Sequence, residues 1–129
     1  MAGTTMATKT EVIDRLFAAI TGGNVEAARS IYAPDAKIWH NFDNIEQAPE
    51  QNLQTLGWLS RSVKNLRYED VTRTEMADGR VFQQHTMRGT SQSGNDFELF
   101  ACIVFTLDGD HITRLEEYLD TAQAAALRG

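Results

Sequence analysis

The sequence predicts an α+β fold in which helices pack on one face of a curved antiparallel sheet. Three segments with helical periodicity lie within residues 8–63, whereas the second half of the chain alternates with period two and is divided by the short connections "ADG", "SQSGND" and "DGD". Helices followed by hairpin-linked strands are typical of this class. With 129 residues the chain can bury a core without metal or disulfide support, so we expect one domain, residues 1–129.

Three helices are expected in the first half. The segment "TKTEVIDRLFAAITGG" carries Thr8 and Glu11 at capping-box spacing, an apolar stripe, and two glycines that suit a C-terminal stop. A second helix begins at Val25 and should end at Pro34, whose ring cannot continue the hydrogen-bond ladder. The third opens at Pro49, a favourable first helical residue, in "PEQNLQTLGWLSRSV".

Between the second and third helices, "DAKIWHNF" indicates a short strand, and four longer strands follow. These are "LRYEDVTRTEM", "RVFQQHTMRGT", "FELFACIVFTL" and "HITRLEEYL". The third of the four is apolar on both faces, with Phe97, Leu99, Ala101, Ile103 and Phe105 on one and Phe100, Cys102 and Val104 on the other. An apolar outer face needs a cover, so we expect a homodimer through it; the alternative cover is the C-terminal tail.

Composition limits the partners. There are 18 acidic and 12 basic side chains, giving a net charge of -6, and no run of Lys or Arg, so nucleic-acid binding is not expected. A single cysteine, Cys102, cannot form an intramolecular disulfide. The start of the chain lacks the apolar region of a signal peptide, and no stretch is apolar enough to span a bilayer. We therefore expect a soluble cytoplasmic protein without a membrane partner.

The phrases "IYAPDAKIWHN" and "DGDHITRLEEYLD", with the three helices and the meander, resemble the nuclear transport factor 2-like superfamily, also called SnoaL-like. The resemblance covers nearly the whole chain and implies an α+β cone with a cavity. This superfamily contains isomerases, dehydratases, hydrolases, polyketide cyclases and non-catalytic binding domains, so the fold does not choose the function.

Several members of this superfamily offer patterns for the site. Limonene-epoxide hydrolases use Tyr-x-Asn, Arg-x-Asp and Trp-x-Asp on three strands. The corresponding positions here are Trp39 and Asn41, His85 and Met87, and Leu115 and Glu117, of which only Asn41 is identical. The resemblance thus implies a shared pocket and not the same reaction.

The two other patterns match less well. Ketosteroid isomerases place a tyrosine where this chain has Leu16 and an aspartate where it has His40. SnoaL-like polyketide cyclases are matched by Asp120, but Ser91 stands where that family often has a histidine.

The best catalytic candidates are Glu117 and His85. Glu117 shares a strand face with Leu115 and Leu119, and burial among leucines disfavours the charged form of a carboxyl group, as a general acid/base near neutral pH requires. His85 shares a strand face with Met87. Its strand lies two strands away from that of Glu117, about 10 Å at the usual strand spacing, and His85 could act as the proton partner of Glu117. The alternative for Glu117 is a place at the open rim of the cavity or a pairing with an arginine. The alternative for His85 is a structural role as a hydrogen-bonded core residue.

The remaining site candidates have structural alternatives. Asp120 could act at the cavity mouth, but its spacing to Gln123 favours a helix cap. Trp39 and Asn41 could orient a substrate, although core packing is the commoner role of such a tryptophan. The apolar pocket lining is predicted to be Met87, Leu99, Ala101, Ile103 and Leu115.

The histidines of this chain have no zinc-site spacing, and nucleotide-binding motifs are missing, so neither a metal nor a cofactor is expected. The sequence therefore predicts cofactor-independent acid/base chemistry on a small apolar metabolite, by isomerisation, dehydration, cyclisation or hydrolysis. The alternative is a non-catalytic ligand-binding or dimerisation domain. Polar side chains around open volume would favour the enzyme, and a filled core would favour the alternative.

Overall fold

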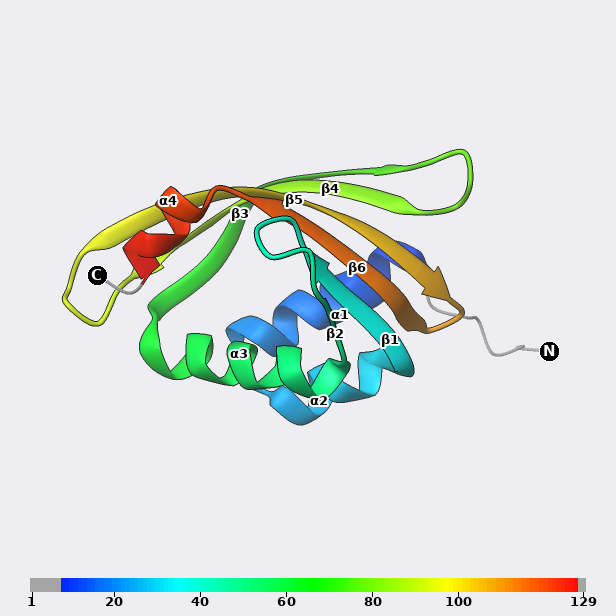
Figure 1. Cartoon of the computed structure of the whole chain (residues 1–129), viewed down its shortest axis with the longest axis horizontal. Helices are drawn as coiled ribbons and strands as arrows, with labels where there is room; N and C mark the ends of the chain where they lie inside the picture. Colours follow the sequence, from blue (N-terminus) through cyan, green and yellow to red (C-terminus); the bar gives the residue numbers. More distant parts are fainter. Residues whose placement is uncertain (1–7, 128–129) are drawn as a thin grey trace.

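The computed structural model describes residues 8–127, and three helices pack on one face of a six-stranded sheet (Figure 1). The predicted α+β class is confirmed. The elements are α1 (Lys9–Thr21), α2 (Val25–Ile31), β1 (Tyr32–His40), β2 (Glu46–Gln47), α3 (Pro49–Ser62), β3 (Lys64–Glu75), β4 (Val81–Thr90), β5 (Asp96–Asp108), β6 (His111–Leu119), α4 (Thr121–Ala124) and the 3-10 turn η1 (Ala125–Leu127). Residues 1–7 and 128–129 of the predicted 1–129 domain lie outside the described part.

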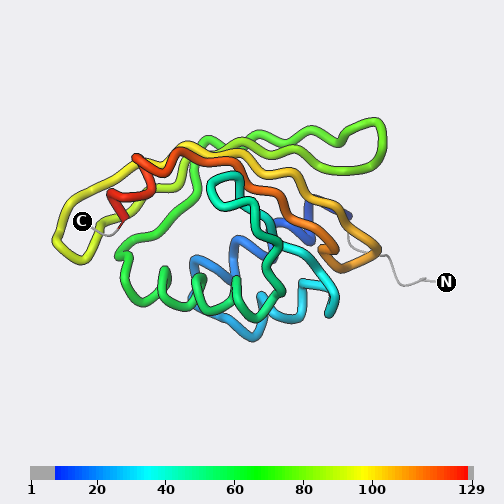
Figure 2. The backbone as a smooth tube through the Cα atoms, in the orientation of Figure 1, coloured from blue at the N-terminus to red at the C-terminus, as the bar shows by residue number. Residues whose placement is uncertain are grey.

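The sheet is mixed, with the order β2-β1-β6-β5-β4-β3. Strands β3 to β6 form the predicted antiparallel meander, with hairpin turns at Gly79 and Gly109, whose φ values of 91° and 59° favour glycine. Strand β1 pairs in parallel with β6, which the sequence analysis did not predict. The first and last long strands therefore lie side by side in the middle of the molecule (Figure 2).

The helix ends follow local rules. Thr8 and Glu11 form the predicted capping box, in which each side chain accepts from the other's backbone N–H. Helix α2 ends at Ile31 and not at Pro34, because Tyr32 is already extended and begins β1. Pro34 lies where the pairing of β1 with β6 is irregular, a place that tolerates a residue without an N–H. No helix within residues 8–127 is long and apolar enough to cross a membrane.

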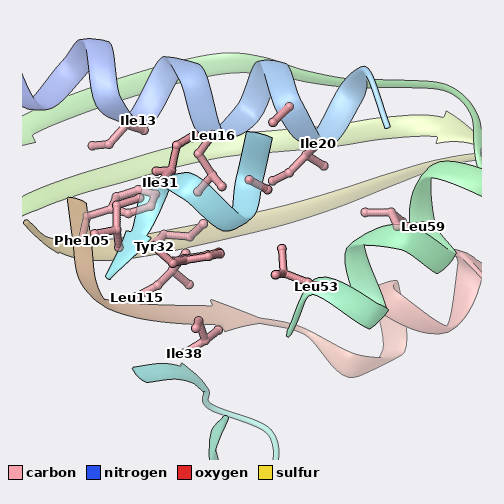
Figure 3. Close-up of a cluster of buried hydrophobic side chains, with 14 of the residues drawn as sticks. Ile13, Leu16, Ile20, Ile31, Tyr32, Ile38, Leu53, Leu59, Phe105 and Leu115 are labelled. Atoms are coloured by element: carbon pink, nitrogen blue, oxygen red, sulfur yellow. The ribbon is translucent and has the colours of Figure 1, made fainter. Parts of the chain in front are cut away.

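The core lies between the three helices and the inner face of the sheet (Figure 3). Helix α1 contributes Ile13 and Leu16, and the sheet contributes Ile38, Phe105 and Leu115, all nearly inaccessible to solvent. Leu16 and Leu115 also line the cavity described below, so the packed core continues into the cavity wall.

No helix within residues 8–127 packs on the outer face of the sheet (Figure 1). Phe100 and Tyr118 on this face are 54% and 42% exposed, and Cys102 lies opposite Tyr118 and two residues after Phe100 on the same face. Cross-strand aromatic side chains of this kind suit the packing of a second sheet. The homodimer stays a prediction, and these residues identify the surface that would form it.

We expect Phe100→Ser combined with Tyr118→Ser to convert a dimer into a monomer, because both changes remove apolar area from the centre of that surface. Light scattering coupled to gel filtration measures the mass. Ile45→Ser is the matched control, since Ile45 is 55% exposed but lies outside the long strands. A wild-type protein with the mass of one chain would contradict the dimer.

Candidate functional site

A cavity of about 270 Å³ lies between α1, α3 and the inner face of the sheet. Helix α1 contributes Leu16, Phe17 and Ile20, and α3 contributes Leu56 and Leu59. Of the predicted lining residues, Met87, Leu99, Ile103 and Leu115 face this volume. The cavity is mostly apolar and of a size that suits a small organic molecule.

Glu117 and His40 form a pair in the cavity wall. The parallel register of β1 and β6 places His40 opposite Glu117, and His40 Nε2 lies 3.1 Å from Glu117 Oε1. Their side chains are only 13% and 16% exposed, and both line the cavity. The carboxylate predicted at this position therefore has a histidine partner, but that partner is His40 and not His85.

Two tyrosines, the buried Tyr32 and the partly buried Tyr68, line the same cavity. Tyr32 donates to Asn52 Oδ1 at 3.1 Å, and both side chains are buried. Burial raises the pKa of Tyr32 and of Tyr68, and the negative charge of Glu117 raises both further. Both phenols therefore keep their protons at neutral pH, and the hydroxyl of Tyr68 can donate to a ligand in the cavity.

His85 is buried on the inner face of β4, with 4% exposure, one layer behind the cavity wall. Its ring lies between Phe17 and Tyr68, with centroid distances of 5.5 and 5.2 Å, and both of those residues line the cavity. Burial lowers the pKa of His85, while the charge of Glu117 raises it in part. His85 thus senses Glu117 through its charge, and its nitrogen contact is with Gln83.

Trp39 and Asn41, predicted to orient a substrate, take structural roles. Trp39 packs its ring against Tyr118 at 5.2 Å on the outer face and donates its indole N–H to Asn44 Oδ1 at 2.7 Å. The exposed Asn41 accepts the backbone N–H of Leu119 at 3.1 Å, which ties the loop after β1 to the end of β6. Neither lines the cavity.

Asp120 caps α4, because its carboxylate accepts the N–H of Ala122 at 2.8 Å. This is the structural alternative considered for it. The segment after it borders the cavity through Thr121 and Leu127. Ala101, predicted in the lining, adjoins a shallow groove on the outer face.

Sequence reasoning missed His40, Tyr32, Tyr68 and Asn52. His40 was noticed only as a departure from the isomerase pattern, since nothing in the local sequence shows that β1 pairs with β6. Tyr32 lay in a segment predicted to be helical. Among residues 8–127 no group of three His, Cys, Asp or Glu side chains is arranged to hold a metal ion.

Helices on one face of a curved sheet, with a cavity between the layers, define a nuclear transport factor 2-like α+β cone. The sequence model of the SnoaL-like domain family matches residues 13–115, so the chain belongs to that family. It is an NTF2-like protein with a cavity suited to a small molecule. A search of curated proteins gave no match.

Solved structures share this fold at low sequence identity. A proposed polyketide cyclase from Pseudomonas putida KT2440 is 19% identical, with a TM-score of 0.79 over 95% of this chain and 99% of its own. A protein from Catenulispora acidiphila with a ketosteroid isomerase-like fold, solved with trimethylamine, is 17% identical, with a TM-score of 0.77 over 95% and 96%. An NTF2-like protein from Burkholderia xenovorans LB400 is 20% identical, with a TM-score of 0.72 over 96% and 100%.

The lowered pKa of His85 predicts a pH-dependent stability. The folded protein binds a proton at His85 less readily than the unfolded chain, whose histidine has the ordinary value of 6.5. As the pH falls below that value, the unfolded state gains a proton that the folded state lacks, so the free energy of unfolding decreases, by at most about 1.4 kcal/mol per pH unit.

Urea unfolding at about pH 7.5 and about pH 5 checks this. His85→Gln should lose less stability over that interval than the wild type does. The control is His111→Gln, because His111 is exposed at the start of β6. Equal losses in the wild type and in His85→Gln would show that His85 does not contribute.

Proposed function

We propose that this protein is a cofactor-independent acid/base enzyme that acts on a small, mostly apolar metabolite. The observation that supports it is the Glu117–His40 pair in the wall of an apolar cavity. A carboxylate and an imidazole in contact can hold, release and exchange a proton near neutral pH. A pair of this kind is of little use for packing, and it faces open volume.

In this proposal Glu117 takes a proton from the substrate, or from the attacking water in hydrolysis, and His40 orients the carboxylate through the contact at 3.1 Å. The proton returns from Glu117 to another atom of the substrate in isomerisation and cyclisation, or to the leaving oxygen in dehydration and hydrolysis. Negative charge that develops on a substrate oxygen is stabilised by the protonated phenol of Tyr68, which lines the same cavity. Isomerisation, dehydration, cyclisation and hydrolysis all include such steps.

The size and polarity of the cavity limit the substrate. A volume of about 270 Å³ is near the lower end for ligand sites, and the walls are mainly leucine, isoleucine, methionine and aromatic side chains. A neutral ring compound with one or two oxygens fits this description. Polyketide cyclisation, the activity proposed for the Pseudomonas putida relative, is one reaction compatible with it.

The second candidate is a non-catalytic binding domain with the same cavity. It is favoured by the fact that Tyr32 and Asn52 satisfy one another, as side chains in a purely structural network would. It predicts binding without turnover. The two candidates therefore differ in whether a bound molecule exchanges protons with the protein.

Exchange of the α-protons of 2-indanone for deuterium, followed by proton NMR in D₂O, tests the enzyme. We expect the wild type to accelerate exchange and Glu117→Gln to reduce the acceleration about 100-fold or more, because the amide cannot accept the proton. His40→Gln should reduce it less, since the carboxylate remains.

Glu116→Gln is the matched control. Glu116 is the neighbouring carboxylate on β6, points to the other face and lies near Arg80 and Arg114. The Glu116→Gln variant should accelerate exchange of the α-protons of 2-indanone as much as the wild type does. Exchange that is equally fast with the wild type, Glu117→Gln and Glu116→Gln, while 2-indanone binds to all three, would support the non-catalytic candidate instead.

A further inference from the structure

A chain of side-chain contacts crosses from the surface of α1 to His85. Asp14 accepts from Arg73 Nη1 at 2.7 Å, and Arg73 Nε donates to Gln83 Oε1 at 2.6 Å. Gln83 Nε2 then lies 2.8 Å from His85 Nδ1. Gln83 is completely buried, and the side chain of Arg73 is only 16% exposed. Three elements, α1, β3 and β4, hold this chain in place.

The chemistry of these groups fixes where the proton of His85 sits. A guanidinium group can only donate, so the Gln83 atom that faces Arg73 must be the carbonyl oxygen. The other end of the amide is then its NH₂ group, which can only donate to His85. Nδ1 must accept, and the proton of a neutral imidazole is left on Nε2.

The Nε2–H group is left without a partner among residues 8–127, although it is buried. An unpaired buried donor is unfavourable, and such groups in native proteins call for an explanation. The imidazole packs edge-on against the rings of Phe17 and Tyr68, and both of those residues line the cavity, so these two rings separate His85 from that volume.

We propose that the Asp14–Arg73–Gln83 chain holds His85 as a hydrogen-bond donor for the ligand, which makes the site selective for a neutral molecule carrying an acceptor oxygen. His85 does not line the cavity itself, so the rings of Phe17 and Tyr68 move apart when the acceptor reaches Nε2–H. This inference rests on the proposed small-molecule site. It gives His85 the part of a donor and leaves the acid/base part to Glu117.

The charges around His85 agree with this assignment. Burial and the positive charge of Arg73 both lower its pKa, and Glu117 opposes them only in part, so the imidazole is neutral near pH 7. A neutral imidazole with Nε2 protonated and Nδ1 already bonded has no free site to take a proton. The imidazole can still donate a hydrogen bond from Nε2–H. Gln83 and Arg73 are the positioning residues for that donor.

Nitrogen-15 NMR of labelled protein at about pH 7 measures the tautomer directly, because protonated and unprotonated ring nitrogens have distinct shifts. We expect Nε2–H in the wild type. Gln83→Glu replaces the donating amide by an accepting carboxylate, so it should move the proton to Nδ1 or charge the ring. Gln84→Glu, one residue along on the outer face, is the matched control and should change neither.

The ligand arm compares 2-indanone with 2-methyleneindane, which has the same shape but no acceptor oxygen. We expect 2-indanone to shift the Nε2 resonance and to bind about fivefold to tenfold more tightly. That preference should disappear in Gln83→Glu and persist in Gln84→Glu.

An Nδ1–H tautomer or a charged ring in the wild type would overturn the inference, and so would binding of 2-indanone that leaves Nε2 unshifted. Exchange of 2-indanone protons without an Nε2 shift would overturn this inference and leave the proposed enzyme intact. A shift of the Nε2 resonance without exchange of 2-indanone protons would support this inference and contradict the proposed enzyme. Failure of 2-indanone to bind at all would count against both.

Discussion

The parallel pairing of β1 with β6 is the constraint on which the site depends. It aligns Ile38 with Leu115 and His40 with Glu117, so that a core contact and the Glu117–His40 pair share one register. Because successive strand residues point to opposite faces, a slip of one residue would turn His40 out of the cavity and expose Ile38. The burial of Ile38 therefore stabilises the register that brings His40 to Glu117.

The same register explains why the polar residues form two groups. Arg73, Gln83, Ile103, Glu117 and His40 follow one another across five strands on the inner face. Ile103 is buried in the middle of this row and makes no polar contact. It separates the Glu117–His40 pair from the Arg73–Gln83–His85 chain, so the two groups interact through charge and can hold different protonation states.

The sequence predicts the features that depend on neighbouring residues and misses those that depend on contacts between distant segments of the chain. The capping box at Thr8, the cap at Asp120 and the apolar lining on β4 and β5 follow from local rules, and they were predicted. The partner of Glu117 was not, because strands far apart in the chain carry no local mark of their pairing. Trp39 alternates correctly for its strand, but alternation alone does not say which face is the inner one.

Several departures from ordinary packing rules lie in or beside the cavity. A mostly buried carboxylate lies beside an imidazole, two tyrosines line the same cavity, and the Nε2–H of His85 has no acceptor among residues 8–127. Around them, helix caps and cross-strand pairs obey the rules, as expected when a sequence departs from them mainly at functional sites. A domain selected only for dimerisation would gain stability by filling the cavity and replacing His85 with an apolar residue. The retained polar groups therefore argue for a ligand whose atoms complete the contacts that the protein leaves open.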